Sequence, residues 1–191
     1  MTQTDRLKWN ERYKSGAYGE RRYASALLQE WIDRIPCGRA LDVACGAGRN
    51  ALFLAARDFT VDAVDISREA LDLARGRAQE AGLHINWIEH DLDESLALDA
   101  QYALIVLMRY VNLPLLRQLT GNLAPGGFLV CEQHLVTDEE VVGPSNSAYR
   151  VASGALRTAA KDLRIHHLEE AIVQDPDHRK AALARLVAQK P

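Results

Sequence analysis

The chain has 191 residues, of which 48% are hydrophobic and 26% charged, a composition typical of one globular domain. Its formal net charge of −3 excludes an overall basic field that would attract nucleic acid or an anionic membrane, and no apolar run reaches the length of a membrane span. Three cysteines without metal-ligand spacing, and a polar segment at residues 1–12 in place of a signal peptide, predict a cytoplasmic protein with reduced thiols.

The first feature along the chain is an aromatic-rich segment at residues 8–19. Trp9 and Tyr13 are four residues apart and therefore share one face of a helix. Two interpretations stay open: a small amphipathic helix packed on the domain, or a lid whose rings cover a ligand and attract a sulfonium cation. Residues 1–20 are treated as an N-terminal lid segment of a single domain over residues 1–191.

The stretch after the helix predicted at residues 23–35 organises the chain. A short buried strand at residues 40–43 carries Asp42 near its carboxyl end, and Gly46 and Gly48 precede a helical run. A strand, a glycine turn and a helix expose backbone N–H groups to a closely approaching ligand. The turn lacks the first and third glycines of a dinucleotide fingerprint, and Asp42 suits a cationic amino-acid moiety better than a pyrophosphate. A tight turn with a chance aspartate is the alternative.

The next two predicted strands also end in acidic residues. Asp65 follows a strand at residues 60–64 and lies 23 residues past Asp42, the spacing at which α/β nucleotide folds place an acid on a ribose. Its alternative is a helix cap, for which Ser67 competes. Asp91 and Leu92 follow a strand at residues 83–89, where Asp91 would accept from the exocyclic amine of an adenine and Leu92 would cover a face of its ring.

A continuous apolar run at residues 102–108 predicts a central parallel strand, covered on both faces. Arg109, Tyr110 and Asn112 emerge at its carboxyl end, where open α/β sheets line their ligand crevice.

The other predicted elements alternate between helix and strand, which favours a parallel sheet with helices on both faces and a C-terminal antiparallel hairpin. They are helices at residues 49–57, 68–81, 113–123 and 151–163, a tight turn at 124–127, strands at 128–132, 164–173 and 179–189, a polar loop at 137–147 and a turn at 175–177.

Three acids on one edge of the sheet indicate a ligand that is positively charged, rich in hydroxyls and adenine-bearing, which favours S-adenosylmethionine (SAM) over NAD. Residues 41–48, 64–65 and 123–130 resemble the signature segments of class I SAM-dependent methyltransferases. Residues 8–13, with Arg109 and Tyr110, look more narrowly like the bacterial tellurite-resistance and thiopurine methyltransferase relatives.

This resemblance implies a single-domain Rossmann-like fold with a mostly parallel seven-stranded sheet, order 3-2-1-4-5-7-6, whose seventh strand is antiparallel. It also implies SAM as cofactor and a small-molecule methyl acceptor. The residues expected to bind the cofactor are Trp9, Tyr13, Asp42, Ala44, Gly46, Gly48, Asn50, Asp65, Ile66, Asp91, Leu92, Met108 and Arg109.

The acceptor is expected to be a thiol, a chalcogen oxyanion or another small nucleophile. A thiol or chalcogen anion needs no strong base, and Arg109 would orient it beside Tyr110. An oxygen acceptor would need a base, and His134 and Glu132 are the candidates. No catalytic base is assigned between them. A non-catalytic SAM- or adenosine-binding module is the alternative function. We expect no metal, no nucleic acid or membrane partner, and a monomer or homodimer.

Overall fold

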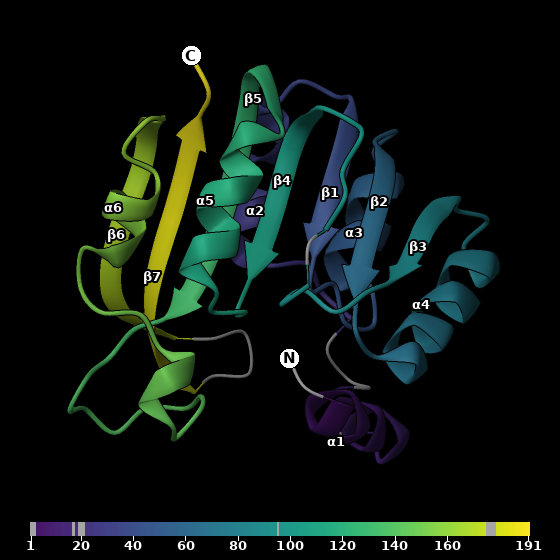
Figure 1. The fold of residues 1–191 in the computed structure, drawn as a ribbon, viewed down its shortest axis with the longest axis horizontal. Helices are drawn as coiled ribbons and strands as arrows, with labels where there is room; N and C mark the ends of the chain where they lie inside the picture. Colours follow the sequence, from purple (N-terminus) through teal and green to yellow (C-terminus); the bar gives the residue numbers. More distant parts are fainter. Residues whose placement is uncertain (1–2, 17, 19–21, 95, 175–178) are drawn as a thin grey trace.

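A computed structural model describes residues 3–16, 18, 22–94, 96–174 and 179–191, which form a single seven-stranded sheet in the order β3-β2-β1-β4-β5-β7-β6 (Figure 1). Strands β1 to β5 pair in parallel, and β7 runs antiparallel to both β5 and β6. The predicted order and the antiparallel seventh strand are therefore confirmed. The strands are β1 (Arg39–Val43), β2 (Thr60–Asp65), β3 (Ile85–Glu89), β4 (Tyr102–Met108), β5 (Leu123–His134), β6 (Arg164–Gln174) and β7 (Lys180–Gln189).

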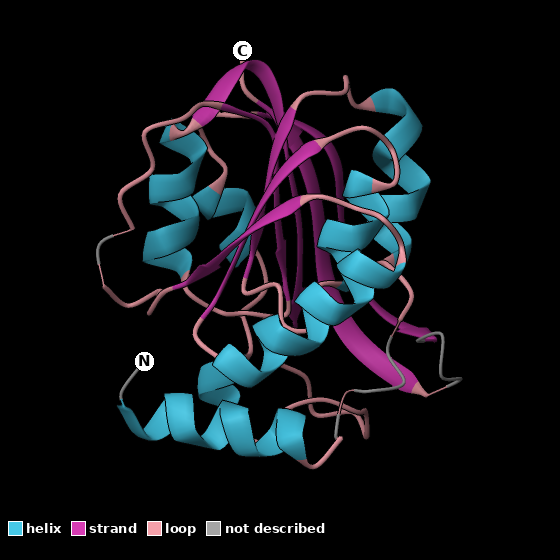
Figure 2. Cartoon of the chain, turned by 90° about the vertical axis from the view of Figure 1, so that its right-hand side faces the viewer, coloured by secondary structure: helices cyan, strands magenta, loops and turns pink. Residues whose placement is uncertain are grey.

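Helices cover both faces of this sheet (Figure 2). On one face α5 and α6 pack against the strands, and on the other face α2, α3 and α4 do so. The helices are α1 (Gln3–Lys14), α2 (Ala26–Trp31), α3 (Arg49–Ala55), α4 (Arg68–Glu80), α5 (Leu113–Gly121) and α6 (Ala155–Ala159), with short 3₁₀ turns η1 (Ile32–Arg34) and η2 (Ser147–Tyr149).

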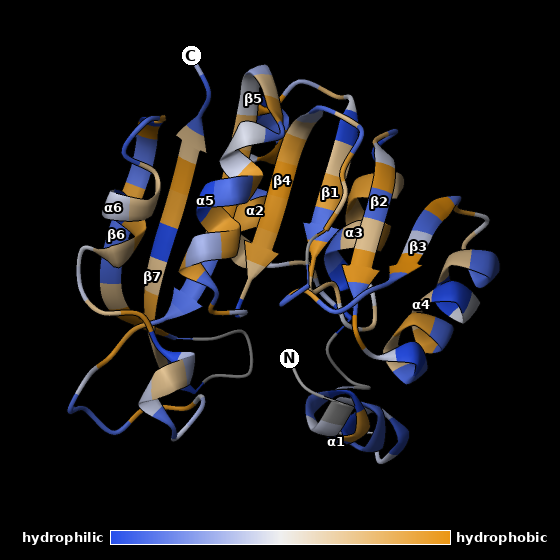
Figure 3. Cartoon of the chain, viewed as in Figure 1, coloured by the Kyte–Doolittle hydropathy of each residue, from blue (hydrophilic) through white to orange (hydrophobic). Residues whose placement is uncertain are grey.

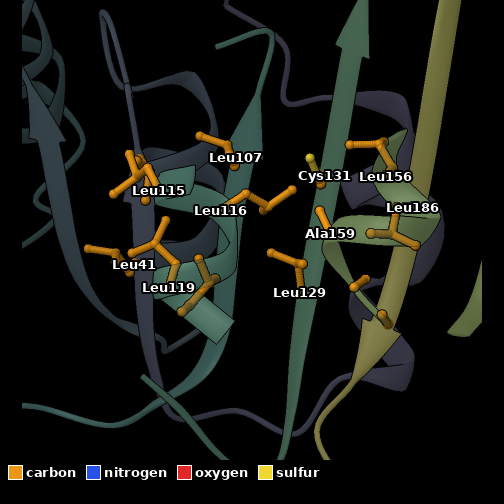
Figure 4. Packing of buried hydrophobic residues seen from close by; sticks show 14 of the residues in the cluster. Leu41, Leu107, Leu115, Leu116, Leu119, Leu129, Cys131, Leu156, Ala159 and Leu186 are labelled. Atoms are coloured by element: carbon orange, nitrogen blue, oxygen red, sulfur yellow. The ribbon is translucent and has the colours of Figure 1, made fainter. Parts of the chain in front are cut away.

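The middle of the sheet is apolar on both faces, as the orange strands of Figure 3 show, because β4 carries no charged side chain and lies between β1 and β5. Leucines of α5 and α6 pack on those of the sheet in Figure 4. The labelled leucines of this cluster are Leu41, Leu107, Leu115, Leu116, Leu119, Leu129, Leu156 and Leu186. Burial of this kind stabilises the fold by roughly 25 cal/mol per Å² of apolar surface removed from water.

The prediction of a tight turn at residues 124–127 was wrong, because β5 already begins at Leu123. Gly126 has a φ of 76°, and its N–H donates to the carbonyl of Lys190, so the chain bulges without leaving the sheet. A Cβ on Gly127 would lie 2.6 Å from the carbonyl oxygen of Tyr102, so a larger residue would not fit beside β4.

The helix predicted at residues 151–163 is reduced to α6 because Val151 bridges in parallel to Leu135, and Gly154, with a φ of 77°, starts the helix later. The helix predicted at residues 23–35 begins only at Ala26, after the N-cap Ser25. The turn predicted at residues 175–177 and part of the lid segment lie outside the described residues. No described helix has both the length and the apolar character to cross a membrane.

Candidate functional site

The site begins at the carboxyl end of β1. Asp42 is only 1% exposed, and its Oδ2 accepts a hydrogen bond from the Ala51 N–H at 3.0 Å. Burial raises the pKa of Asp42 to about 7, although the hydrogen bond from Ala51 opposes the shift. The Asp42 carboxyl therefore stabilises the start of α3 through the Ala51 N–H.

The glycine turn after β1 contains three residues with positive φ: Ala44 at 54°, Gly46 at 55° and Gly48 at 76°. A Cβ on Gly48 would lie 2.6 Å from the ring of Trp87, so only glycine fits there. A Cβ on Gly46 would overlap the hydroxyl of Tyr13. Gly46 and Gly48 are buried, and the Tyr13 hydroxyl of α1 lies directly against the Gly46 backbone.

Asp65 ties the glycine turn to the next helix. Its Oδ2 accepts from the Gly46 N–H at 2.7 Å, and its Oδ1 accepts from the Ser67 N–H at 2.8 Å. Burial raises the pKa of this carboxyl. A carboxylate has about four lone-pair directions, so these two bonds are compatible with further hydroxyl donors. Ile66, the next residue, is 2% exposed.

Asp91 and Leu92 follow β3 on the same edge, as predicted from their position in the sequence. Both are buried, and Asp91 Oδ1 accepts from the Asp93 N–H at 3.0 Å. The structure thus places Asp42, Asp65 and Asp91 at or just beyond the carboxyl ends of β1, β2 and β3.

Helix α1 lies across this edge, below the carboxyl ends of the strands in Figure 1. Asn10 Oδ1 accepts from the Ser67 hydroxyl at 2.8 Å, which fastens α1 to the start of α4. Lys14 pairs with Glu69 of α4 at 3.3 Å. Lys8 lies 5.9 Å from the ring centroid of Tyr149, so α1 also contacts η2.

The face of α1 toward the glycine turn is aromatic. The ring centroids of Trp9, Tyr13 and Tyr18 are 5.4 to 6.5 Å apart. Burial, followed by the nearby charge of Asp65, raises the pKa of Tyr13. The sequence analysis included Trp9 and Tyr13 in the site but missed Asn10 and Tyr18. Asn10 is a single polar residue and Tyr18 lies beyond the helix, so neither belongs to a periodic pattern.

At the same edge of the sheet, Arg109 follows β4 with a φ of 59°. Its Nε donates to Glu132 Oε1 at 3.0 Å, and its backbone N–H donates to the Glu132 carbonyl at 2.6 Å. Arg185 Nε lies 3.4 Å from Glu132 Oε2. Met108, the last residue of β4, is 8% exposed. Glu132 is therefore ion-paired through both oxygens, which opposes its use as a base.

Three other candidates have local partners. Tyr110 donates its hydroxyl to Asp93 Oδ1 at 3.2 Å, and burial raises its pKa. Asn50 Oδ1 accepts from the Ser25 N–H at 2.9 Å and so anchors α2 to α3. His134, at the end of β5, packs against Gly143 of the following loop. Within the described part of the chain, no three His, Cys, Asp or Glu side chains are grouped to hold a metal ion.

Comparison with known proteins places this edge in a recognised domain. Residues 40–127 match the family model for a methyltransferase domain. A ubiquinone biosynthesis O-methyltransferase of Rickettsia felis is 28% identical over 95 residues, which cover 47% of this chain and 38% of the relative. The chain thus spans less than half the length of that curated relative.

Solved structures share the whole architecture. TehB from Haemophilus influenzae superposes with a TM-score of 0.77 at 21% identity, over 95% of this chain and 67% of that chain. The N-methyltransferase NodS from Bradyrhizobium japonicum WM9, solved in complex with S-adenosyl-L-homocysteine, gives a TM-score of 0.63 at 18% identity over 86% of this chain and 84% of that chain. At these identities the similarity establishes the fold.

Proposed function

We propose that the chain transfers a methyl group from SAM to a small-molecule acceptor, because residues 40–127 match a methyltransferase domain and the chain shares its fold with a methyltransferase solved in complex with S-adenosyl-L-homocysteine. The observation that carries the proposal is the set of three buried aspartates, Asp42, Asp65 and Asp91, at one edge of the sheet. Asp42 precedes the glycine turn, Asp65 accepts from its Gly46 N–H, and Tyr13 of α1 lies against it.

The residues present fit this cofactor. Gly46 has no Cβ and a left-handed backbone, so the methionine moiety could approach the turn closely at the place where the Tyr13 hydroxyl now lies. Asp65 would accept from the ribose hydroxyls, and Asp91 from the adenine amine, since a carboxylate takes donors that a neutral residue satisfies only in part. Tyr13 lies over Gly46 in the structure, so we expect its side chain or α1 to shift when the cofactor enters.

When bound, SAM supplies an electrophilic methyl group on a sulfonium, which an acceptor takes by in-line displacement. This chain's residues would then align the acceptor and exclude water. Trp9 and Tyr18 would close the site from the α1 side. Arg109 at the end of β4 would orient the acceptor.

Of the two candidate bases for an oxygen acceptor, Glu132 is ion-paired and His134 packs against Gly143 of the following loop. Since both oxygens of Glu132 are paired with arginines, we favour an acceptor that arrives deprotonated, a thiol or a chalcogen oxyanion, over an alcohol. Ubiquinone biosynthesis, named for one relative, would instead require an oxygen acceptor. Methylation assays with a thiol and a phenol in parallel separate the two classes.

The test of the cofactor is a calorimetric titration with SAM. We expect saturable binding to the wild type, and a loss of roughly 2 to 3 kcal/mol in Asp65→Asn, the scale for losing charge-assisted hydrogen bonds. The matched control is Asp62→Asn, which changes the other buried aspartate of β2, bonded by Arg39 at 2.8 Å. The control should lower stability and leave SAM affinity unchanged. No binding by the wild type, or equal affinity in both variants, would contradict the assignment.

A further inference from the structure

The backbone at Arg109 is unusual. Three described residues other than glycine have positive φ: Ala44, Asp58 and Arg109. Side chains rarely adopt this conformation because the Cβ crowds the backbone, and such residues persist where the surroundings hold them, often at functional sites. Ala44 and Arg109 follow the neighbouring strands β1 and β4 at the carboxyl edge of the sheet.

Glu132 holds Arg109 at two points. The backbone N–H of Arg109 donates to the Glu132 carbonyl at 2.6 Å, and the side-chain Nε donates to Oε1 at 3.0 Å. One residue therefore fixes both the chain direction after β4 and the orientation of the guanidinium. A lysine at position 109 would lack the planar fork that gives this geometry.

The ion pairs continue from Glu132 toward β7 and β6, away from Arg109. Arg185 of β7 approaches Glu132 Oε2 at 3.4 Å and Glu169 of β6 at 3.4 Å. The strand register places Glu132, Arg185 and Glu169 side by side across β5, β7 and β6. Arg185 thus supports Glu132 from the side opposite to Arg109.

Burial makes this arrangement more than a surface ion pair. The side chain of Glu132 is 4% exposed and that of Arg109 is 14% exposed. A buried carboxylate is stable only when it is paired, and a guanidinium matches its geometry best. With Glu169, which pairs with Arg185, the four side chains are together neutral, so the attraction for an anion would come from the Arg109 guanidinium itself.

We propose that Glu132 is a positioning residue for the transfer reaction: its carboxylate, supported by Arg185, holds the Arg109 guanidinium at the carboxyl edge of the sheet, where it orients an acceptor that carries a negative charge. The proposal rests on the function proposed above. It assigns Glu132 a role in alignment through Arg109 and none in proton transfer.

The first test needs neither cofactor nor acceptor. In the ¹⁵N-labelled full chain, the Arg109 Nε–H resonance is assigned by its loss in Arg109→Lys, and its exchange with water is measured by NMR. We expect exchange about tenfold faster in Glu132→Gln and unchanged exchange in the matched control Glu169→Gln, which removes the same charge two strands further away. Unchanged exchange in Glu132→Gln, or equal acceleration in both variants, overturns the proposal.

The second test separates positioning from folding. SAM affinity by calorimetry should be the same in the wild type and both variants, because Glu132 has no contact with the glycine turn among its hydrogen bonds and ion pairs in the described residues. With thionitrobenzoate, a coloured anionic thiolate, as the acceptor probe, kcat should fall about tenfold or more in Glu132→Gln without a rise in KM. A parallel loss of SAM affinity would instead indicate a structural role and overturn the proposal.

Glu132→Asp guards against a Glu132→Gln variant that does not fold. It keeps the charge but shortens the side chain by one methylene, so we expect intermediate Arg109 exchange and an intermediate kcat. Wild-type kcat and exchange in Glu132→Asp would overturn the proposal. If the wild type fails to bind SAM, the proposed function fails, while the Arg109 exchange experiment still decides whether Glu132 positions that arginine.

Discussion

The pH dependence of folding provides a direct test of Asp42. Its carboxyl is 1% exposed, and burial raises its pKa from 3.8 to about 7. The folded protein therefore keeps the Asp42 proton to a higher pH than the unfolded chain does. Since folding then takes up a proton, the free energy of unfolding should fall as pH rises from about 4 to about 7. Asp42→Asn removes this titration and keeps an oxygen that accepts from Ala51.

The size of the effect follows from the two pKa values. One pKa unit corresponds to about 1.4 kcal/mol, and the contribution of Asp42 changes by roughly 2 kcal/mol between about pH 5 and pH 7. Asp65 is also buried with a raised pKa and is present in both proteins, so the part of its contribution that is independent of Asp42 cancels in the difference.

The assay is urea denaturation of the wild type and Asp42→Asn at a series of pH values between about 5 and 8, followed by tryptophan fluorescence. The variant should become more stable relative to the wild type as pH rises through this window. The control is Asp72→Asn, since the side chain of Asp72 on α4 is 55% exposed, and its curve should run parallel to that of the wild type. A constant difference between Asp42→Asn and the wild type would refute the reasoning, because it would mean that Asp42 titrates at its ordinary value.

Two further predictions concern the lid and the glycine turn. Asn10→Ala removes the acceptor of the Ser67 hydroxyl, so amide exchange across α1 should accelerate while the free energy of unfolding changes by less than about 1 kcal/mol; unchanged exchange would speak against the fastening of α1 to α4. Gly48→Ala places a Cβ 2.6 Å from Trp87 at a φ of 76° and should cost roughly 2 kcal/mol in urea denaturation. Gly76→Ala in α4, where a Cβ meets nothing within 4 Å, should be neutral or stabilising, and equal effects of the two substitutions would contradict the packing argument.

The sequence predicted the sheet well where hydrophobic patterning decides the structure. The apolar run of β4 coincides with its predicted range of residues 102–108, because a strand buried on both faces leaves no periodic ambiguity. The strand order came from the resemblance to class I methyltransferases, since periodicity alone does not give which strands pair. Boundaries were less predictable at residues 123–127, where proline and two glycines indicated a turn, while pairing with Tyr102 and the backbone of Lys190 keeps the chain in the sheet.

Contacts between segments far apart in the sequence limited how much of the candidate site could be predicted. The acids at the strand ends could be found from their positions, because the carboxyl ends of parallel strands share one edge. The ion pairs of Glu132 with Arg109 and Arg185 could not, since they depend on the register of β5 with β4 on one side and with β7 on the other. From the sequence, Glu132 is a carboxylate near the end of a strand, and no pattern indicates that two arginines contact it.

The buried aspartates of the sheet differ in a way that separates structure from function. At the amino end of β2, Asp62 bonds to the guanidinium of Arg39, and although burial acts to raise its pKa, that bond and its other hydrogen bonds lower it. Asp42 and Asp65 accept from backbone N–H groups, and burial raises the pKa of both. Asp62 is thus satisfied by the Arg39 guanidinium within the scaffold. Two carboxylates held mainly by backbone dipoles remain electrostatically suited to an incoming cation, and a sulfonium- and ammonium-bearing cofactor at the glycine turn would supply that charge.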